Sequence, residues 1–349
     1  MQGKYPSPHN SSNKGNNTNR RPSAASYLDP KNRLVGGAEA LGRVVEVRNE
    51  ATTSSSSWKV GDAVVLGESG WGSWRSHVWV PAGSLLRVPA DLMELAATST
   101  LSSVTLPQIA LLSQVAGTAY RLLHDFGNLQ PNDVVIQNAG TSAVSMCVAE
   151  LMRILFPTSH LVSFVRRAEE DDEWSELVNL LTCNRTTQHT VISELTAMAV
   201  DKSEWRDWKQ QHLPTGPVVL GLNSVHGPQT SQLFFDLLAN DARLVTYGAM
   251  SRQALPVPAA PLIFRNVSVC GYWHSRWMVN HRIEPGVLQP CPRQEMLNAL
   301  SQAVVEGGLT LPPVHAADLS QVSQSGLREI FDSVPTKPLR AKLVWNLQK

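Results

Sequence analysis

One strand-turn-helix segment of the sequence has the residue types that bind a dinucleotide. The stretch DVVIQNAGTSAVSMCVAELM reads as a buried strand, a tight turn and an apolar-rich helix. A helix that begins directly after a strand offers free N–H groups and the positive end of its dipole to a pyrophosphate. The usual GxGxxG pattern is absent, since Gly140 is the only glycine and Thr141 and Ser142 occupy the turn. An ordinary turn capped by Ser142 would have the same pattern.

Two arginines follow the next predicted strand. HLVSFVRRAEEDDEW ends its apolar run at Arg166 and Arg167, and acidic residues come only after them. At this place, about 20 residues past the turn, an acidic side chain would bind the ribose 2′-hydroxyl of NAD, whereas an arginine accommodates the 2′-phosphate of NADP. The sequence therefore favours NADPH as the cofactor. The alternative is a solvated run of charges.

The sequence leaves a tyrosine as the candidate proton donor. No Ser-His-Asp order, HExxH motif or Walker pattern is present, which leaves hydrolase and phosphoryl-transfer functions without support. The histidines are unclustered, and the four cysteines form neither a CxxC pair nor a zinc-type spacing, so we expect no metal site and a reducing compartment. A phenol has a pKa near 10 and can donate a proton while a hydride arrives elsewhere. Tyr5, in QGKYP, is the candidate.

The elements that must position these residues follow two patterns. Before residue 91 the chain is β-rich, with short strands expected in GRVVEV, DAVVLG and SHVWVPAGSLLRVP, and residues 91–125 have a helical texture. From DVVIQN onward strands alternate with helices; later strands are expected in PVVLGLNSV, ARLVTYGAM and NVSVCGYW, with a helix in SQLFFDLLAND. Such alternation predicts a parallel, doubly wound sheet. The tail is expected to hold a helix (EMLNALSQAVVEG), then VHAADLS and a closing strand, KLVWNL.

Composition limits the class of protein and its partners. The 349 residues are 42% hydrophobic and 17% charged, which is typical of a soluble globular protein with a core and of about two domains. The formal net charge of +1 gives no indication of a nucleic-acid partner. Apolar runs fall far short of the roughly 20 residues of a membrane span. Residues 7–34 are rich in Ser, Asn and Pro and are expected to form a mobile polar loop.

Several separate motifs together resemble one enzyme family. IQNAGTSAV, LNSVHG, LVTYGAMS, LIFRNVSVCGYW and GSWR are similar, in order, to segments of the NADPH-dependent mitochondrial trans-2-enoyl-CoA/enoyl-ACP reductases, which are zinc-free members of the medium-chain dehydrogenase/reductase superfamily. The resemblance runs from about residue 35 to the C-terminus. QGKYP resembles the family's QGxY segment, which carries its catalytic tyrosine, so the resemblance implies that Tyr5 protonates the substrate.

The resemblance also implies roles for residues that bind the cofactor. Thr141, Ser142, Ala143 and Val144 match the pyrophosphate-binding turn, and Arg166 and Arg167 match the 2′-phosphate segment, although Ala168 stands where the family has its second arginine. Tyr247, Gly248, Ala249 and Met250 match a strand-end loop near the nicotinamide, and Tyr272, Trp273 and His274 match a second such stretch. Lys342 matches a lysine that approaches the cofactor. Taken alone, Tyr247 and Trp273 would be core aromatics and Lys342 a surface residue.

The chain departs from the family pattern in a few places. Val115 and Ala116 replace the family's Asn-Pro, which removes a polar contact near the cofactor. Ala38 replaces an asparagine, and Ser145 replaces the glycine that opens the phosphate-binding helix. The strands that precede QGxY in the family are absent, so we expect an N-terminally truncated chain.

We therefore expect an α/β protein with a Rossmann doubly wound parallel sheet and a GroES-like β-rich catalytic domain. The expected parts are residues 1–117 (catalytic domain, N-terminal part), 118–275 (Rossmann domain, binding NADPH) and 276–349 (C-terminal return to the catalytic domain). The expected activity is reduction of enoyl-CoA or enoyl-ACP thioesters in mitochondrial fatty-acid synthesis by a homodimer. The alternatives are a quinone-type reductase and a non-catalytic nucleotide-binding remnant.

Overall fold

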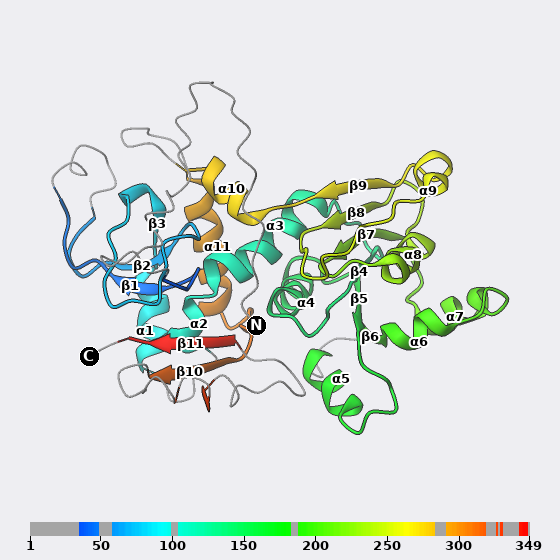
Figure 1. Cartoon of the computed structure of the whole chain (residues 1–349), viewed down its shortest axis with the longest axis horizontal. Coiled ribbons are helices and arrows are strands. Elements are labelled where there is room, and N and C mark those ends of the chain that lie inside the picture. The colour runs from blue at the N-terminus through cyan, green and yellow to red at the C-terminus, as the bar shows by residue number, and fades with distance from the viewer. Residues whose placement is uncertain are drawn as a thin grey trace.

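The computed structural model describes residues 35–48, 58–98, 104–182, 188–282, 291–318, 326, 329–330 and 342–347. In Figure 1 the β-rich part lies on the left and a larger α/β part on the right, with α3 and α11 between them. Tyr5 and the expected polar loop at 7–34 lie outside the described residues.

A six-stranded parallel sheet organises the larger part. Its strand order is β6-β5-β4-β7-β8-β9, so the order reverses beside β4 as in dinucleotide-binding folds. The strands are β4 (Val134–Gln137), β5 (His160–Val165), β6 (His189–Ser193), β7 (Val218–Asn223), β8 (Arg243–Thr246) and β9 (Ser268–Gly271). Their helices are α4 (Ala143–Leu155), α5 (Trp174–Thr182), α6 (Glu194–Ala199), α7 (Trp205–His212), α8 (Pro228–Leu237), α9 (Ala259–Phe264) and α10 (His274–Asn280). The expected doubly wound α/β class is confirmed.

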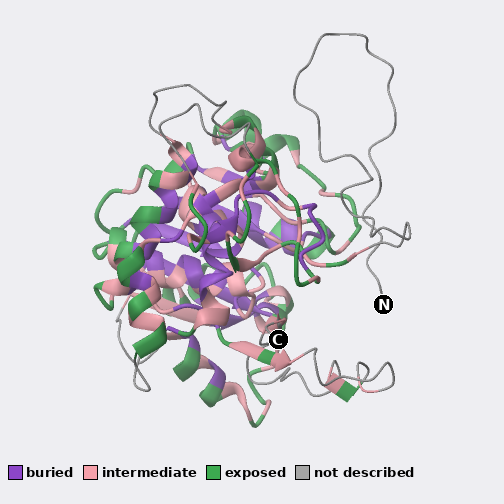
Figure 2. Cartoon of the chain, turned by 90° about the vertical axis from the view of Figure 1, so that its left-hand side faces the viewer, coloured by how far each residue is buried: buried purple, intermediate pink, exposed green. Residues whose placement is uncertain are grey.

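Alternation along the strands explains why both faces are covered. In β4, Val135 packs into a core with Val148 and Leu151 of α4, whereas Val134 and Ile136 pack into a second core with Phe234 of α8. Successive side chains of a strand point to opposite faces, so a fully apolar strand needs helices on both sides. Figure 2 shows the buried residues concentrated through the middle of the molecule.

The β-rich part is smaller than the sequence predicts. Its antiparallel sheet has the order β1-β2-β3, with β1 (Leu41–Arg43), β2 (Ala63–Leu66) and β3 (Leu85–Arg87), the last preceded by η3 (Ala82–Ser84). The strand expected in GRVVEV ends at Arg43. The strand expected at SHVWV does not form, since residues 76–81 are irregular. Val45 and Trp79 are exposed, and neither packs into an apolar cluster of the described residues.

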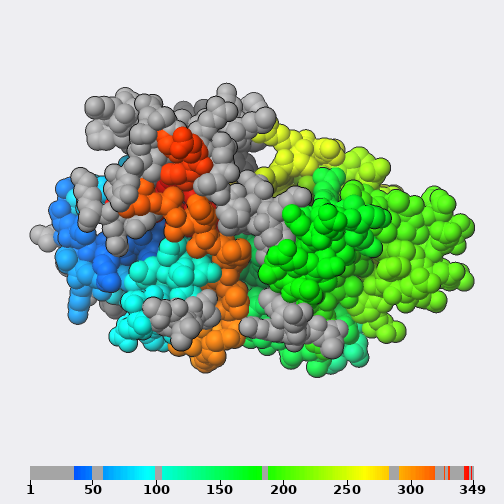
Figure 3. All heavy atoms as spheres, turned by 90° about the horizontal axis from the view of Figure 1, so that it is seen from below, coloured from blue at the N-terminus to red at the C-terminus, as the bar shows by residue number. Residues whose placement is uncertain are grey.

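Helices and a final pair of strands join the two parts. The helices are α1 (Ala90–Thr98), α2 (Leu106–Ile109), the π-helical turn η4 (Leu112–Ala116), α3 (Gly117–Phe126) and α11 (Pro292–Val305). The strands β10 (Val314–Asp318) and β11 (Lys342–Asn346) pair in parallel, and Figure 3 shows C-terminal residues in orange and red beside the N-terminal residues in blue and cyan. Among the described residues, no helix has the length and apolarity to cross a membrane.

Candidate active site

The turn between β4 and α4 forms as a compact, hydrogen-bonded unit. Ala139 takes a left-handed conformation (φ 50°), and Gly140 lies so close to β5 that an added Cβ would come within 3.0 Å of Ser163 Cβ. Ser142 caps α4: its Oγ accepts from Ser145 N (3.2 Å) and donates to Ser145 Oγ (2.9 Å). The predicted residues Thr141–Val144 therefore lie at the start of α4, where the first backbone N–H groups precede any intrahelical acceptor.

Asn138 ties this turn to the neighbouring strand ends. Its amide donates to Asn223 Oδ1 (2.8 Å) and to Val225 O (2.9 Å), and its Oδ1 accepts from Ser224 N (2.7 Å). The Asn223 side-chain amide in turn donates to Thr246 Oγ1 (3.4 Å). The carboxyl ends of β4, β7 and β8 are thus held in register by two buried amides. This network was not predicted, although an Asn at the end of each of two buried strands (VVIQN and LGLN) was an available signal.

The two predicted arginines after β5 differ in their surroundings. The Arg166 side chain is 65% exposed and lies 3.8 Å from the buried carboxylate of Glu194. The Arg167 side chain is only 15% exposed and pairs with Glu173 (3.1 Å) and Asp171 (3.7 Å). Arg166 can therefore reach an anion at low cost, whereas Arg167 is already held by two carboxylates.

The loop after β8 approaches the loop after β7. A Cβ added at Gly248 would collide with Ser224 O, so only glycine permits this approach. Tyr247 donates its backbone N–H to Asn223 O (3.0 Å), and burial raises the pKa of its phenol. Ala249 and Met250 are exposed. Tyr247 therefore lies inward while the rest of the predicted stretch leads to the surface.

The stretch after β9 forms a directed chain of hydrogen bonds. Tyr272 Oη and His274 Nδ1 are 2.8 Å apart, and His274 Nε2 lies 2.8 Å from Ser113 O. Because a backbone carbonyl can only accept, His274 carries its proton on Nε2 and Tyr272 donates to Nδ1. Burial lowers the pKa of His274 to about 4, so the ring is neutral near pH 7. Burial also raises the pKa of Tyr272, and the Asp125 carboxylate raises it further.

Trp273 and Lys342 are the last two predicted residues of the site. Trp273 is 57% exposed, which excludes the interpretation as a core aromatic. Lys342 Nζ lies 3.4 Å from both carboxylate oxygens of Glu39, so β11 and the segment before β1 are joined by an ion pair.

These segments surround a pocket of about 250 Å³. Its described lining consists of Glu39, Gln114, Val115, Thr118, Val144, Tyr247, Tyr272, Trp273, His274, Ser275 and Lys342. Predicted residues from α4, from the segments after β8 and β9, from the start of α10 and from β11 therefore meet at one place, at the carboxyl edge of the sheet. Thr141, Ser142, Ala143, Arg166, Arg167, Gly248, Ala249 and Met250 do not line it, and Gln114, Thr118, Glu39 and Ser275 were missed.

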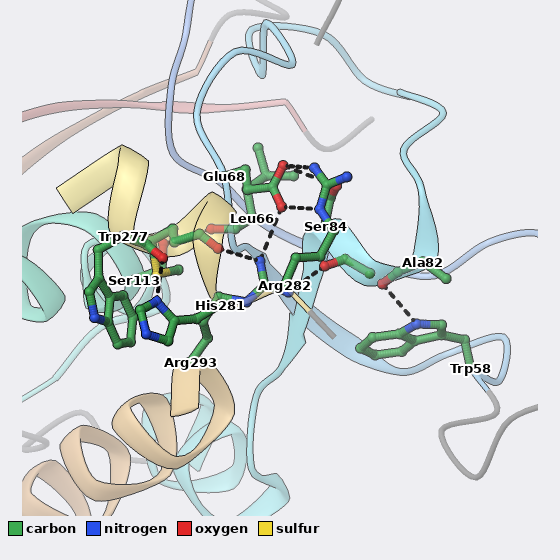
Figure 4. Close-up of polar contacts among 12 residues, drawn as sticks. Trp58, Leu66, Glu68, Ala82, Ser84, Ser113, Trp277, His281, Arg282 and Arg293 are labelled. Atoms are coloured by element: carbon green, nitrogen blue, oxygen red, sulfur yellow. Dashed lines mark hydrogen bonds and ion pairs between the residues drawn. The ribbon is translucent and has the colours of Figure 1, made fainter. Parts of the chain in front are cut away.

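A buried charge cluster supports the wall that α10 forms. Glu68 accepts from Arg282 Nε (2.7 Å) and Arg293 Nη1 (3.1 Å), and Glu68 and Arg293 are both about 1% exposed (Figure 4). Arg293 also donates to Met278 O (3.2 Å). Ser69, next to Glu68, donates to the pocket residue Ser275 (3.3 Å). The end of β2 thus holds both ends of α10 in place.

Among the described residues, no group of three or more His, Cys, Asp or Glu side chains lies close enough together to hold a metal ion. The site offers instead a helix N-terminus and an exposed arginine for phosphates, and a partly apolar pocket with a few polar groups. Such a cleft at the reversal of strand order is where this class of sheet binds dinucleotides.

Comparison with known proteins identifies similar enzymes. The chain is 31% identical over 302 residues to the mitochondrial enoyl-acyl-carrier-protein reductase of Xenopus tropicalis, covering 85% of this chain and 75% of the relative. No protein-family model matches.

Solved structures give the same result. The Etr1p/Etr2p heterodimer of the mitochondrial 2-enoyl thioester reductase from Candida tropicalis is similar with a TM-score of 0.68 and 26% identity, covering 85% of this chain and 78% of that chain. The Etr1p complex with NADP and crotonyl-CoA has a TM-score of 0.67 and 25% identity, at the same coverage of both chains.

Proposed function

Because the chain belongs to the enoyl-acyl-carrier-protein reductase family, we propose that it reduces trans-2-enoyl thioesters to acyl thioesters with NADPH. The observation that carries this function is the pocket at the carboxyl edge, where Val144, Tyr247, Trp273 and Lys342 meet from separate segments. A family resemblance alone would not require these side chains to share one cavity.

The residues present fit a dinucleotide. Gly248 gives the backbone close approach that a cofactor cleft needs, and α4 presents its N-terminus beside the pocket residue Val144. Arg166 supplies an exposed guanidinium for a 2′-phosphate. When bound, NADPH supplies the hydride that adds to C3 of the enoyl thioester. Thr141–Val144 would hold the pyrophosphate through their backbone.

The proton that completes the reduction at C2 needs a donor from the protein. The Tyr272 hydroxyl directs its proton to His274, and Tyr247 is buried with a raised pKa. We assign the acid to Tyr5, which lies outside the described residues. The residues of the pocket would then orient the substrate and exclude water.

The test is NADPH oxidation with crotonyl-CoA by the chain, by Tyr5→Phe and by the matched control Tyr120→Phe, which changes a half-buried tyrosine of α3 outside the pocket lining. A general acid contributes roughly 10²- to 10⁴-fold, so we expect kcat to fall by about that factor in Tyr5→Phe and to change little in Tyr120→Phe. Equal activity in all three proteins would contradict the role of Tyr5. NADPH binding without turnover would favour the non-catalytic alternative, and turnover of quinones alone would favour a quinone reductase.

The proposal extends to the domains, the assembly and the compartment. The pocket takes residues from 1–117, 118–275 and 276–349, which supports the expected division into a catalytic domain built from both ends and a nucleotide-binding domain between them. A related reductase is the Etr1p/Etr2p heterodimer, which supports dimerisation, and we propose a homodimer for this chain. The curated relatives are named as mitochondrial enzymes, and we propose the same compartment and an enoyl-CoA or enoyl-ACP substrate.

A further inference from the structure

The segment before α3 makes one π-helical turn. Val115 N and Ala116 N both donate to Leu111 O, each at 3.0 Å, so the second bond spans five residues. A π-turn inserts one residue into a helical run and rotates the residues before it relative to those after it. Here the insertion falls at η4, which contributes Gln114 and Val115 to the pocket.

The turn is anchored on two sides by Ser113. Its Oγ donates to Leu66 O at the end of β2 (2.7 Å), and its carbonyl accepts from His274 Nε2 of α10 (2.8 Å). Figure 4 shows the Ser113 side chain directed toward Leu66. Ser113 is fully buried, so this position is fixed by both parts of the molecule. The next residue, Gln114, therefore has its backbone set relative to the pocket.

Gln114 carries an amide nitrogen that has no hydrogen-bond partner among the described residues. This nitrogen, Nε2, is buried, although the residue lines the pocket. A buried donor without a partner costs free energy, and such groups in native proteins need an explanation, for example a ligand. Two hydroxyls of the pocket are committed within the protein: Thr118 donates to Gln114 O (2.5 Å) and Tyr272 donates to His274. The buried Tyr247 hydroxyl, like Gln114 Nε2, has no hydrogen-bond partner among the described residues.

We propose that the Gln114 amide donates a hydrogen bond to a carbonyl oxygen of a bound ligand. This proposal rests on the proposed function, which brings two such oxygens to the pocket: the carboxamide of the nicotinamide and the thioester carbonyl of the substrate. Val115, the neighbour of Gln114 on η4, and Val144 of α4 are apolar residues of the same lining. η4 thus contributes one polar group, the Gln114 amide, to the pocket beside Val115.

The test compares the full-length chain with Gln114→Met, which keeps the length of the side chain but removes the amide. The matched control is Gln232→Met, because Gln232 is exposed on α8 and its amide bonds Asp236. Three quantities are measured: the NADPH dissociation constant by fluorescence titration, KM and kcat with crotonyl-CoA, and the melting temperature without ligand.

We expect Gln114→Met to weaken one ligand about tenfold, the factor for one hydrogen bond, without lowering the melting temperature. A rise in the NADPH dissociation constant would identify the cofactor carboxamide as the acceptor of the Gln114 hydrogen bond. A rise in KM or a fall in kcat, with NADPH binding unchanged, would identify the thioester carbonyl as the acceptor. Gln114→Glu, which replaces the amide donor with a carboxylate, should lose at least as much.

Two results would overturn the inference: both ligands bound within twofold of the wild-type values, or a melting temperature that falls by several degrees in Gln114→Met, which would make the amide structural. If the wild-type chain binds NADPH and turns over crotonyl-CoA, such a result overturns the role of Gln114 and leaves the proposed function in place. A wild-type chain that does neither overturns the proposed function and this inference with it.

Discussion

Two arginines that are neighbours in sequence are predicted to have different roles. Arg166 is exposed and loosely paired at 3.8 Å, whereas Arg167 is held by Glu173 and Asp171. A charge-assisted hydrogen bond is worth about 1.5–3 kcal/mol, so Arg166→Ala should weaken NADPH binding by about 10- to 100-fold. NADH, which lacks the 2′-phosphate, should bind equally well to wild type and variant. Titration of both nucleotides checks this.

Arg167→Ala is the natural control for that measurement. Its ion pairs lie within the loop after β5, so we expect less than a few-fold change in NADPH affinity. If Arg167→Ala lost as much affinity as Arg166→Ala, the division of roles between the two side chains would be wrong.

Two histidines, the buried His274 and the half-buried His189, make stability depend on pH. Burial lowers the pKa of His189 to about 4, as it does for His274, and His189 Nε2 lies 2.7 Å from Ser163 Oγ. The unfolded chain binds these protons near pH 6.5 and the folded chain only near pH 4, so stability is present above pH 6.5 and is lost as pH falls toward 4. Each histidine should cost about 2 kcal/mol between pH 7 and 5.

The free energy of unfolding, measured in urea at pH 7 and at pH 5, should fall less in His189→Asn than in the wild type. We expect the two decreases to differ by about 2 kcal/mol. An asparagine does not titrate, whereas His274 still does. An unchanged difference between the two pH values would show that His189 is not the group responsible.

At the scale of elements, one carboxylate joins the end of β2 to α10 and α11. Glu68 is buried between Arg282 and Arg293, and Arg293 is equally buried. Removing one partner of a buried pair leaves an uncompensated charge and costs about 3–5 kcal/mol, so Glu68→Gln should lower the free energy of unfolding by that amount. Glu46→Gln, at an exposed pair with Arg48, should cost less than about 1 kcal/mol.

Chemical denaturation of the two variants measures this difference. Equal, small losses in Glu68→Gln and Glu46→Gln would show that the cluster does not hold these elements together.

The strands that sequence predicted best have near-continuous apolar residues between turns, which are typical of parallel strands. β4, β5, β7 and β8 each lie within such a predicted stretch and are largely buried, and β9 lies within one although its residues are exposed or half-buried. The strands of the β-rich part were harder to predict. Val45 and Trp79 are residue types that favour strands, but both are exposed and pack into no apolar cluster of the described residues. β6 was missed: HTVIS mixes polar and apolar residues, and its pairing with β5 depends on tertiary contacts.

At the scale of the whole molecule, the pocket could be predicted only in part. Val144, Tyr247, Trp273 and Lys342 were found because the family resemblance assigns them to the cofactor, and the structure brings them to one cavity. Their roles toward the cofactor stay predictions. Gln114 and Glu39 were missed because each acts through contacts distant in sequence: η4 depends on Leu66 and His274, and Glu39 on Lys342. No local pattern encodes such contacts.

The assembly is predicted from an apolar surface on the α/β part. Ile263 and Phe264 on α9 are 69% and 80% exposed and precede β9, which pairs only with β8 in the described chain. An exposed apolar patch beside an open sheet edge is typical of a subunit interface. A second copy is the occupant we propose, because a related reductase is a dimer. Light scattering should therefore give twice the chain mass of 38.2 kDa.

A double variant, Ile263→Asp with Phe264→Asp, should lower the measured mass to that of one chain, because two carboxylates would have to be desolvated in the interface. Leu195→Asp is the matched control, since Leu195 is also exposed but lies on α6. A double variant that keeps the wild-type mass would exclude α9 from the interface, and a wild-type chain with the mass of one copy would exclude the homodimer.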